Sequence, residues 1–142
     1  NKTKIKTFGN FGEGHSFAPI FTSKSVYTRH KNALGKVDRT DIFKFLETKE
    51  TSANEKIQFF KWSLSDLPCG QVAWAIVALG TKEGDPITIL AGGPTGVSCL
   101  NDADGKVLWS VTWSGSCLPA AISQDRIFIT SINGTVRALK NK

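Results

Sequence analysis

The sequence predicts an all-β protein built from repeated units, and three observations support this fold class. Three strand-like runs recur at similar intervals along the chain: IKTFGNF, IQFFKWSL and VLWSVTW. A turn of small residues and a second apolar run follow each of them, at 17–23, 72–80 and 118–123. Glycine and proline fall between the runs, and no long stretch has the 3.6-residue period of a helix.

The length of the repeat narrows the architecture. A repeat of about 40–50 residues that contains four short strands is typical of a β-propeller blade. The sequence therefore predicts a single β-propeller segment over residues 1–142, with blade units at approximately 1–55, 56–105 and 106–142. Three four-stranded blades of this kind would form an incomplete ring, as part of a larger or oligomeric propeller.

In the first unit, strands are predicted at 17–23, 25–29 and 42–46. The stretch between the last two, 30–41, is long and charged, and it is interpreted as an insertion in a hairpin. A second polar loop is predicted at 48–55.

The second and third units alternate strands with glycine-containing turns. Their predicted strands are 72–80, 87–91, 97–100, 106–113, 118–123, 126–132 and 135–140. Gly105 stands where a turn needs a positive φ, and Asn133-Gly134 is the strongest hairpin signal in the chain. The stretches 87–100 and 127–139 also align with each other, which indicates one hairpin used twice.

The order of the strands predicts that this chain does not close a propeller alone. The strand at 4–11 aligns with a fourth strand, so it would complete a blade begun elsewhere, whereas the last strand, 135–140, aligns with a third. Natural propellers have about four to eight blades, and an open array of three would leave two apolar faces and unpaired strand edges. A second copy, another polypeptide or further blades of a larger propeller would complete the ring.

The stretch CLNDADGKVLW (99–109) resembles the repeat of quinoprotein-like (PQQ-type) propellers. A small residue and Leu end a strand, an acidic and glycine turn follows, and Trp stands four residues after the glycine. In that family the Trp docks between neighbouring blades, so the resemblance assigns inter-blade docking to Trp109, and to Phe59 at the aligned position of the preceding unit. The repeat is degenerate before this stretch, and WD-type and integrin-type propellers remain alternatives.

The charge of the chain is uneven. The protein has 18 Lys and Arg against 12 Asp and Glu, a net charge of +6, and most of the excess lies in the first half. Five basic residues concentrate in the predicted insertion: Arg29, His30, Lys31, Lys36 and Arg39. Such a cluster is either a contact for acidic protein segments or phosphates or a solvated loop. The hypothesis carried forward is a partner-binding surface.

Other motifs add little chemistry. NALGKVDR (32–39) resembles a loop of adenylate-forming enzymes whose Lys, here Lys36, contacts the acyl-adenylate, although this sequence shows no nucleotide-binding domain before it. The two His and three Cys show no metal-ligand spacing. No catalytic, cofactor-binding or metal-binding residue is therefore assigned, and no cofactor is expected.

Compartment signals conflict. Unpaired cysteines favour an intracellular location, whereas N-x-T sequons at Asn1 and Asn133 leave a secretory location open. No apolar stretch reaches the length of a membrane span.

The sequence as a whole predicts a non-enzymatic propeller scaffold for protein–protein interaction in a multi-subunit assembly. Its partners would be other protein chains or a second copy that completes the propeller. The basic insertion and the unpaired terminal strands are the predicted contact surfaces. Two alternatives remain open: a quinoprotein-like enzyme or cofactor-binding fragment, and a nucleic-acid-associated basic propeller.

Overall fold

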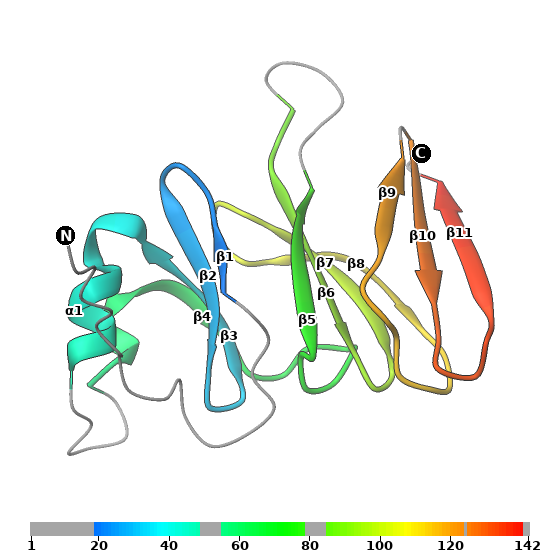
Figure 1. The fold of residues 1–142 in the computed structure, drawn as a ribbon, viewed down its shortest axis with the longest axis horizontal. Helices are drawn as coiled ribbons and strands as arrows, with labels where there is room; N and C mark the ends of the chain where they lie inside the picture. Colours follow the sequence, from blue (N-terminus) through cyan, green and yellow to red (C-terminus); the bar gives the residue numbers. More distant parts are fainter. Residues whose placement is uncertain (1–18, 49–54, 79–84, 124, 141–142) are drawn as a thin grey trace, which may run out of the picture.

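The computed structural model describes residues 19–48, 55–78, 85–123 and 125–140. In these residues the chain forms three antiparallel β-sheets of three or four strands. The sheets stand side by side in the order of the sequence (Figure 1). The all-β prediction is therefore confirmed, whereas the predicted strand at 4–11 lies outside the described residues.

The first sheet joins four antiparallel strands in chain order. They are β1 (Ile20–Phe21), β2 (Ser25–His30), β3 (Ala33–Asp38) and β4 (Phe60–Leu64). A short helix, α1 (Ile42–Glu47), lies between β3 and β4 in the chain. Two 3₁₀ turns, η1 (Arg39–Asp41) and η2 (Ile57–Phe59), precede α1 and β4.

The second and third sheets follow the same up-and-down order. The second consists of β5 (Trp74–Ala78), β6 (Thr88–Gly93), β7 (Gly96–Asn101) and β8 (Val107–Thr112). The third consists of β9 (Ala121–Ser123), β10 (Arg126–Thr130) and β11 (Val136–Lys140). The hairpin predicted at Asn133-Gly134 is confirmed: it joins β10 to β11, and Gly134 has a φ of 84°.

The predicted insertion at 30–41 is wrong. Half of this stretch is β3, which pairs with β2 along its whole length. Leu34 packs into the core shared with the second sheet, and Val37 packs toward α1. The strand is therefore buried on both faces, and its apolar residues do not alternate as they would in a half-buried strand.

The strand predicted at 42–46 is also wrong, because these residues belong to α1. Ile42 and Phe45 are three positions apart, so a helix turns both toward the same side. That side is the first sheet, where they pack with Val26 and Val37. In so short a segment, this spacing did not distinguish a helix from a strand.

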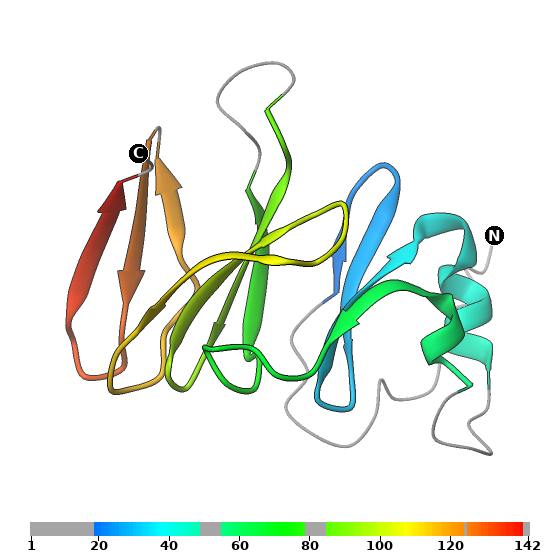
Figure 2. The ribbon, with the colours of Figure 1, turned by 180° about the vertical axis from the view of Figure 1, so that it is seen from behind.

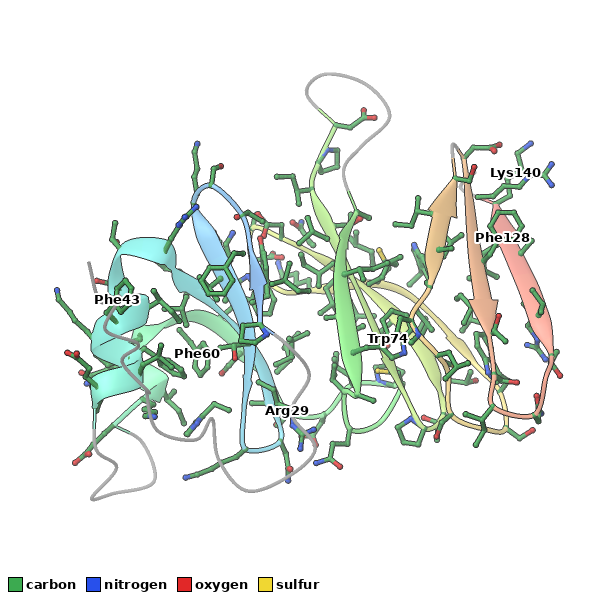
Figure 3. All side chains as sticks on the ribbon, in the orientation of Figure 1. Arg29, Phe43, Phe60, Trp74, Phe128 and Lys140 are labelled. Atoms are coloured by element: carbon green, nitrogen blue, oxygen red, sulfur yellow. The ribbon has the colours of Figure 1, made fainter. Side chains whose placement is uncertain are left out.

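Three apolar clusters hold the layers together. The first lies between the first and second sheets and includes Tyr27, Leu34, Trp62, Ile89 and Leu100. The second lies between the second and third sheets and includes Trp74, Leu90, Val97, Cys117 and Ile129. The third joins α1 to the first sheet (Figure 3, near Phe60). α1 thus covers one end of the stack, and β11 stands at the other end (Figure 2).

The strand registers identify equivalent tryptophans in the two complete sheets. Trp62 on β4 pairs with Lys36, and Trp109 on β8 pairs with Cys99. In both sheets the register shifts by one residue immediately after this pair, so the two positions correspond. The counterpart of Trp109 is therefore Trp62 and not Phe59, whose ring instead lies 6.3 Å from that of Phe45.

Candidate functional site

Two of the five basic residues singled out in the sequence are buried at the tip of the β2–β3 hairpin. Arg29 Nε donates a hydrogen bond to the carbonyl of Lys31 (2.6 Å), and its Nη1 donates to the carbonyl of Val72 (3.2 Å). The ring of His30 lies 6.1 Å from that of Phe45. Arg29 and His30 therefore support the hairpin from within, and Arg29 ties it to the segment that leads into the second sheet.

Lys36 lies between the first and second sheets. Its Nζ donates to Asp102 Oδ2 (2.8 Å) and to the Asp102 carbonyl (3.1 Å). The hydroxyl of Tyr27 donates to Asp102 Oδ1, and the indole nitrogen of Trp62 donates to the Asp102 carbonyl (2.8 Å). Three side chains of the first sheet thus converge on one turn residue of the second, and these four residues are named the Asp102 clasp.

Lys31 and Arg39 are exposed, but they do not lie together. Lys31 is in the β2–β3 turn, with a φ of 53°, and Arg39 follows the far end of β3, where its Nη1 donates to the carbonyl of Thr22 (3.1 Å). A strand of six residues spans about 20 Å. The structure therefore places the five basic residues in three environments rather than in one patch.

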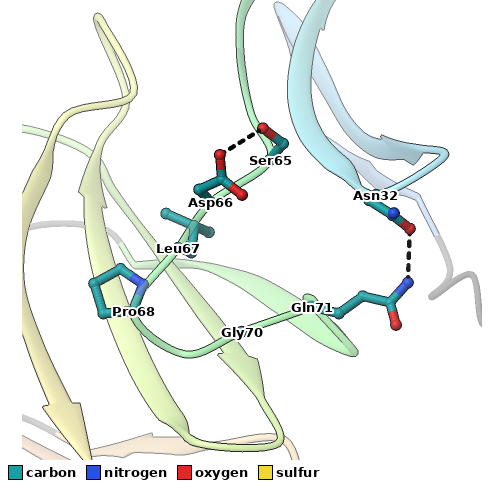
Figure 4. Close-up of a pocket in the computed structure, with 7 residues that line it drawn as sticks. All are labelled: Asn32, Ser65, Asp66, Leu67, Pro68, Gly70 and Gln71. Carbon is teal, nitrogen blue, oxygen red and sulfur yellow. Dashed lines mark hydrogen bonds between the residues drawn. The ribbon is translucent and has the colours of Figure 1, made fainter.

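A cavity of about 680 Å³ opens beside the tip of the β2–β3 hairpin (Figure 4). Its lining comes from the β2–β3 turn and from the connection between β4 and β5: Asn32, Ser65, Asp66, Leu67, Pro68, Gly70 and Gln71. Gln71 Nε2 donates to Asn32 Oδ1 (2.9 Å), which bridges the two walls. Within the described residues, no group of three His, Cys, Asp or Glu side chains is arranged to hold a metal ion.

The three cysteine side chains are buried and reduced. Burial raises the pKa of the Cys69, Cys99 and Cys117 thiols above the ordinary value. A thiol with a raised pKa is a poor nucleophile, because the reactive form is the thiolate. The three cysteines are therefore packed in the core and are not reactive thiols.

The third sheet has three strands where the other two have four, and among the described residues one of its faces has no neighbouring sheet or helix. β11 pairs with β10 on one side, and among the described residues no strand pairs with its other side, here named the open edge. Ile127, Ile129 and Leu139 pack toward the second sheet. Because side chains alternate along a strand, Phe128 and Ala138 point the other way, onto what is here named the open face.

The open face is apolar at its centre and positive at one end. Phe128 is 37% exposed and Val136 is 64% exposed, and Figure 3 shows Phe128 on the third sheet, with Lys140 nearby, at the end of the stack away from α1. Arg126 and Lys140 pair across the two strands. The carboxylate of Asp125 lies 3.9 Å from the former and 3.8 Å from the latter.

A second cavity, of about 590 Å³, runs between the last strands of the second and third sheets and is here named the groove. It is mainly apolar, and its lining residues are Trp109, Ser110, Val111, Ile127, Ala138, Leu139 and Lys140. Trp109 also packs against the core shared by these two sheets. The strand count predicted an unpaired edge here, but the groove and Phe128 were missed, because they depend on which face each residue of β10 takes.

No protein-family model and no curated protein matches this sequence. Within the described residues, no helix has both the length and the apolar character that crossing a bilayer requires.

Proposed function

We propose that this chain is a β-propeller segment of the quinoprotein-like type that acts as a non-catalytic scaffold and binds another protein chain through its third sheet. Support for the repeat comes from the matching registers of Trp62 and Trp109. Support for the blade assignment comes from the up-and-down order shared by all three sheets.

The observation that carries the proposal is the difference between the two ends of the stack. At one end, Ile42 and Phe45 of α1 cover the first sheet. At the other end, the open face exposes Phe128 and Val136 next to the open edge of β11. An exposed apolar face that adjoins an unpaired strand edge is a common basis for association between chains.

Photo-crosslinking tests this proposal at both ends of the stack. A benzophenone amino acid replaces Val136 in one variant and Phe43, which is exposed to a similar extent on α1, in the control. We expect a discrete adduct with one protein from position 136 after irradiation in the cells that express the chain, and none from position 43. No adduct at position 136, or the same adducts from both positions, would contradict the proposal.

Light scattering of the purified chain identifies one class of partner. A particle of twice 15.4 kDa that the substitution Phe128→Lys dissociates would show that the partner is a second copy. A mass of 15.4 kDa at every concentration, together with a crosslink to a different protein, would show that the partner is a different polypeptide.

A further inference from the structure

The backbone of β11 presents three consecutive hydrogen-bonding positions at the open edge. The carbonyl of Thr130 accepts a hydrogen bond from the Leu118 amide (2.8 Å), so Thr130 directs its backbone groups away from β11. Thr130 pairs with Val136, which is therefore in a non-hydrogen-bonded pair with β10. By alternation, the N–H and C=O groups of Val136, Ala138 and Lys140 point to the open edge.

The complete sheets show which side chain a strand at this edge would carry. Ile127 and Leu139 pair and face the second sheet, as Ile89 and Leu100 pair and face the first. Ala138 thus corresponds to Cys99, which pairs with Trp109 on the fourth strand of its sheet.

In the first sheet the same position is Lys36, and it pairs with Trp62. Both complete sheets therefore place a tryptophan beside this position. The equivalent site beside Ala138 has room for a large ring, because the side chain of Ala138 is small. Phe128, which pairs with Ala138, offers an aromatic contact for that ring on the open face.

The charge at the open edge further restricts which partner strand can bind. The open face carries Arg126 and Lys140 against one acid, Asp125, whereas Arg137 turns toward the second sheet, over the ring of Trp113. Arg126 and Lys140 are directly opposite each other, and the single carboxylate of Asp125, 3.9 Å from the former and 3.8 Å from the latter, balances only one of these two charges. An acidic side chain beside Lys140 would balance the other.

Together these observations point to one kind of occupant, and we infer that the open edge of β11 accepts a β-strand from a partner protein, with an aromatic residue beside Ala138 and an acidic residue beside Lys140. The inference deepens the scaffold function and rests on it. Backbone pairing with Val136, Ala138 and Lys140 holds the strand, and the groove beside Trp109 receives the turn that leads into it. The aromatic residue beside Ala138 and the acidic residue beside Lys140 determine which partner strand binds.

A second copy of this chain fits the site less well. Its candidate strand, 4–11, brings Lys4 and Lys6 to an edge that is already positive. Stacking of the whole first sheet onto the open face is also unfavourable, because α1 covers the surface that would make the contact.

A synthetic peptide provides a direct test. The probe carries residues 102–112 with Lys106→Glu, so that the fourth strand of the second sheet brings Trp109 and an acid in the required spacing. Binding of the labelled peptide to the full chain is measured by fluorescence anisotropy. We expect saturable binding that Lys140→Glu in the protein weakens by roughly tenfold, whereas the matched variant Lys24→Glu, remote on the first sheet, has no effect.

NMR measurement of amide exchange in the complex shows which backbone amides of β11 pair with the bound strand. The amides of Val136, Ala138 and Lys140 should slow on binding, whereas that of Arg137, which faces β10, should not change. Ala138→Pro, which removes a donor from the open edge without removing a bond to β10, should abolish binding. The circular dichroism spectrum and the melting temperature of this variant show whether it is folded, and the exchange pattern tests the same point without any substitution.

Three results would overturn the inference. Unchanged affinity for a peptide with Trp109→Ala would exclude the aromatic position, and equal binding of the peptide that retains Lys106 would exclude the acidic one. Tighter binding of a peptide with residues 2–12 would make a second copy the occupant. If the peptide with Lys106→Glu does not bind while the crosslink at position 136 gives a discrete adduct, this inference is wrong and the proposed scaffold function is retained. If the peptide does not bind and position 136 gives no adduct, both the inference and the proposed function are wrong.

Discussion

Trp62 and Trp109 occupy the same register position in successive sheets, and Trp62 shows what a tryptophan does there. Its indole nitrogen donates to the carbonyl of Asp102 across the boundary between the sheets (2.8 Å). Its ring lies against Gly105, where an added Cβ would stand 2.8 Å from the ring atom Cδ2. The contact therefore requires a carbonyl and a glycine in the neighbouring turn as well as the tryptophan.

The Asp102 clasp should contribute strongly to stability. The side chains of Lys36 and Asp102 are 14% and 19% exposed, and Tyr27 is buried. Asp102→Ala leaves the ammonium of Lys36 and the hydroxyl of Tyr27 without their shared acceptor in a site that admits little water. We expect a loss of about 2–4 kcal/mol in the free energy of unfolding, measured by urea denaturation.

Asp104→Ala is the matched control for this substitution. Asp104 is in the same turn, but it is exposed and bonds locally, to the amide and the ammonium of Lys106. An exposed pair of this kind contributes little to stability, because water and salt screen it. Equal losses for the two variants would show that the clasp does not join the sheets.

Tyr27 should resist ionisation while the protein is folded. Burial raises the pKa of its hydroxyl above the ordinary value of 10.0, and the hydrogen bond to Asp102 and the charge of that carboxylate raise it further. A raised folded-state pKa means that its contribution to stability is fully present below about pH 10 and is lost as the pH rises through the folded value. The fold should therefore weaken in alkali.

Ultraviolet absorbance can follow the ionisation of Tyr27 directly, because Tyr27 is the single tyrosine of the chain. We expect no phenolate band at pH 11 in the native protein, and the full band at the same pH after unfolding in guanidinium. Tyr27→Phe should reduce the alkaline loss of stability by up to about 1.4 kcal/mol per pH unit. A native protein that titrates near pH 10 would contradict the buried geometry.

Local signals were sufficient for the hairpins of the second and third sheets. Gly96 and Gly134 have the positive φ that their turns require, and apolar runs flank both turns. The β2–β3 turn has no glycine, and Lys31 takes the left-handed conformation instead. A sequence pattern that relies on glycine therefore missed this hairpin.

The basic site was misread for a related reason. A lysine usually indicates a solvated position, but Lys36 is held between two sheets by Asp102, which lies on the next sheet and is distant in sequence. Only the fold brings the two together. The unpaired strand edge, in contrast, followed from counting strands, because the order of elements is local information.

Gly92 should not tolerate a side chain. The indole of Trp74 lies directly over it, so a Cβ would overlap the ring atoms Cε2 and Cζ2. Trp74 cannot move away freely, because its Nε1 donates to the carbonyl of Cys117 in the segment that leads to the third sheet (2.7 Å). We expect Gly92→Ala to destabilise the protein by about 1–3 kcal/mol, measured by thermal and urea unfolding.

A double-mutant cycle separates the steric overlap between a Cβ at Gly92 and the ring of Trp74 from other effects of the substitution. Trp74→Leu should itself destabilise the protein, but in that background Gly92→Ala should cost much less, because the smaller side chain leaves room for the methyl group. Additive losses would show that the penalty has another origin. Gly134→Ala gives the cost of a positive φ alone, since nothing lies within 4 Å of its added Cβ.

The three cysteines should be unreactive until the sheets separate. Cys99 and Cys117 belong to the core between the second and third sheets, and Cys69 belongs to the core between the first and second. Burial raises the pKa of each thiol, which lowers the thiolate fraction, and the packing excludes a bulky reagent. With an aromatic disulfide reagent at pH 8, we expect no rapid reaction in the native protein and three thiols in guanidinium. A rapid reaction of one equivalent would locate an opening between two of the sheets, and Cys69→Ser or Cys117→Ser would show between which.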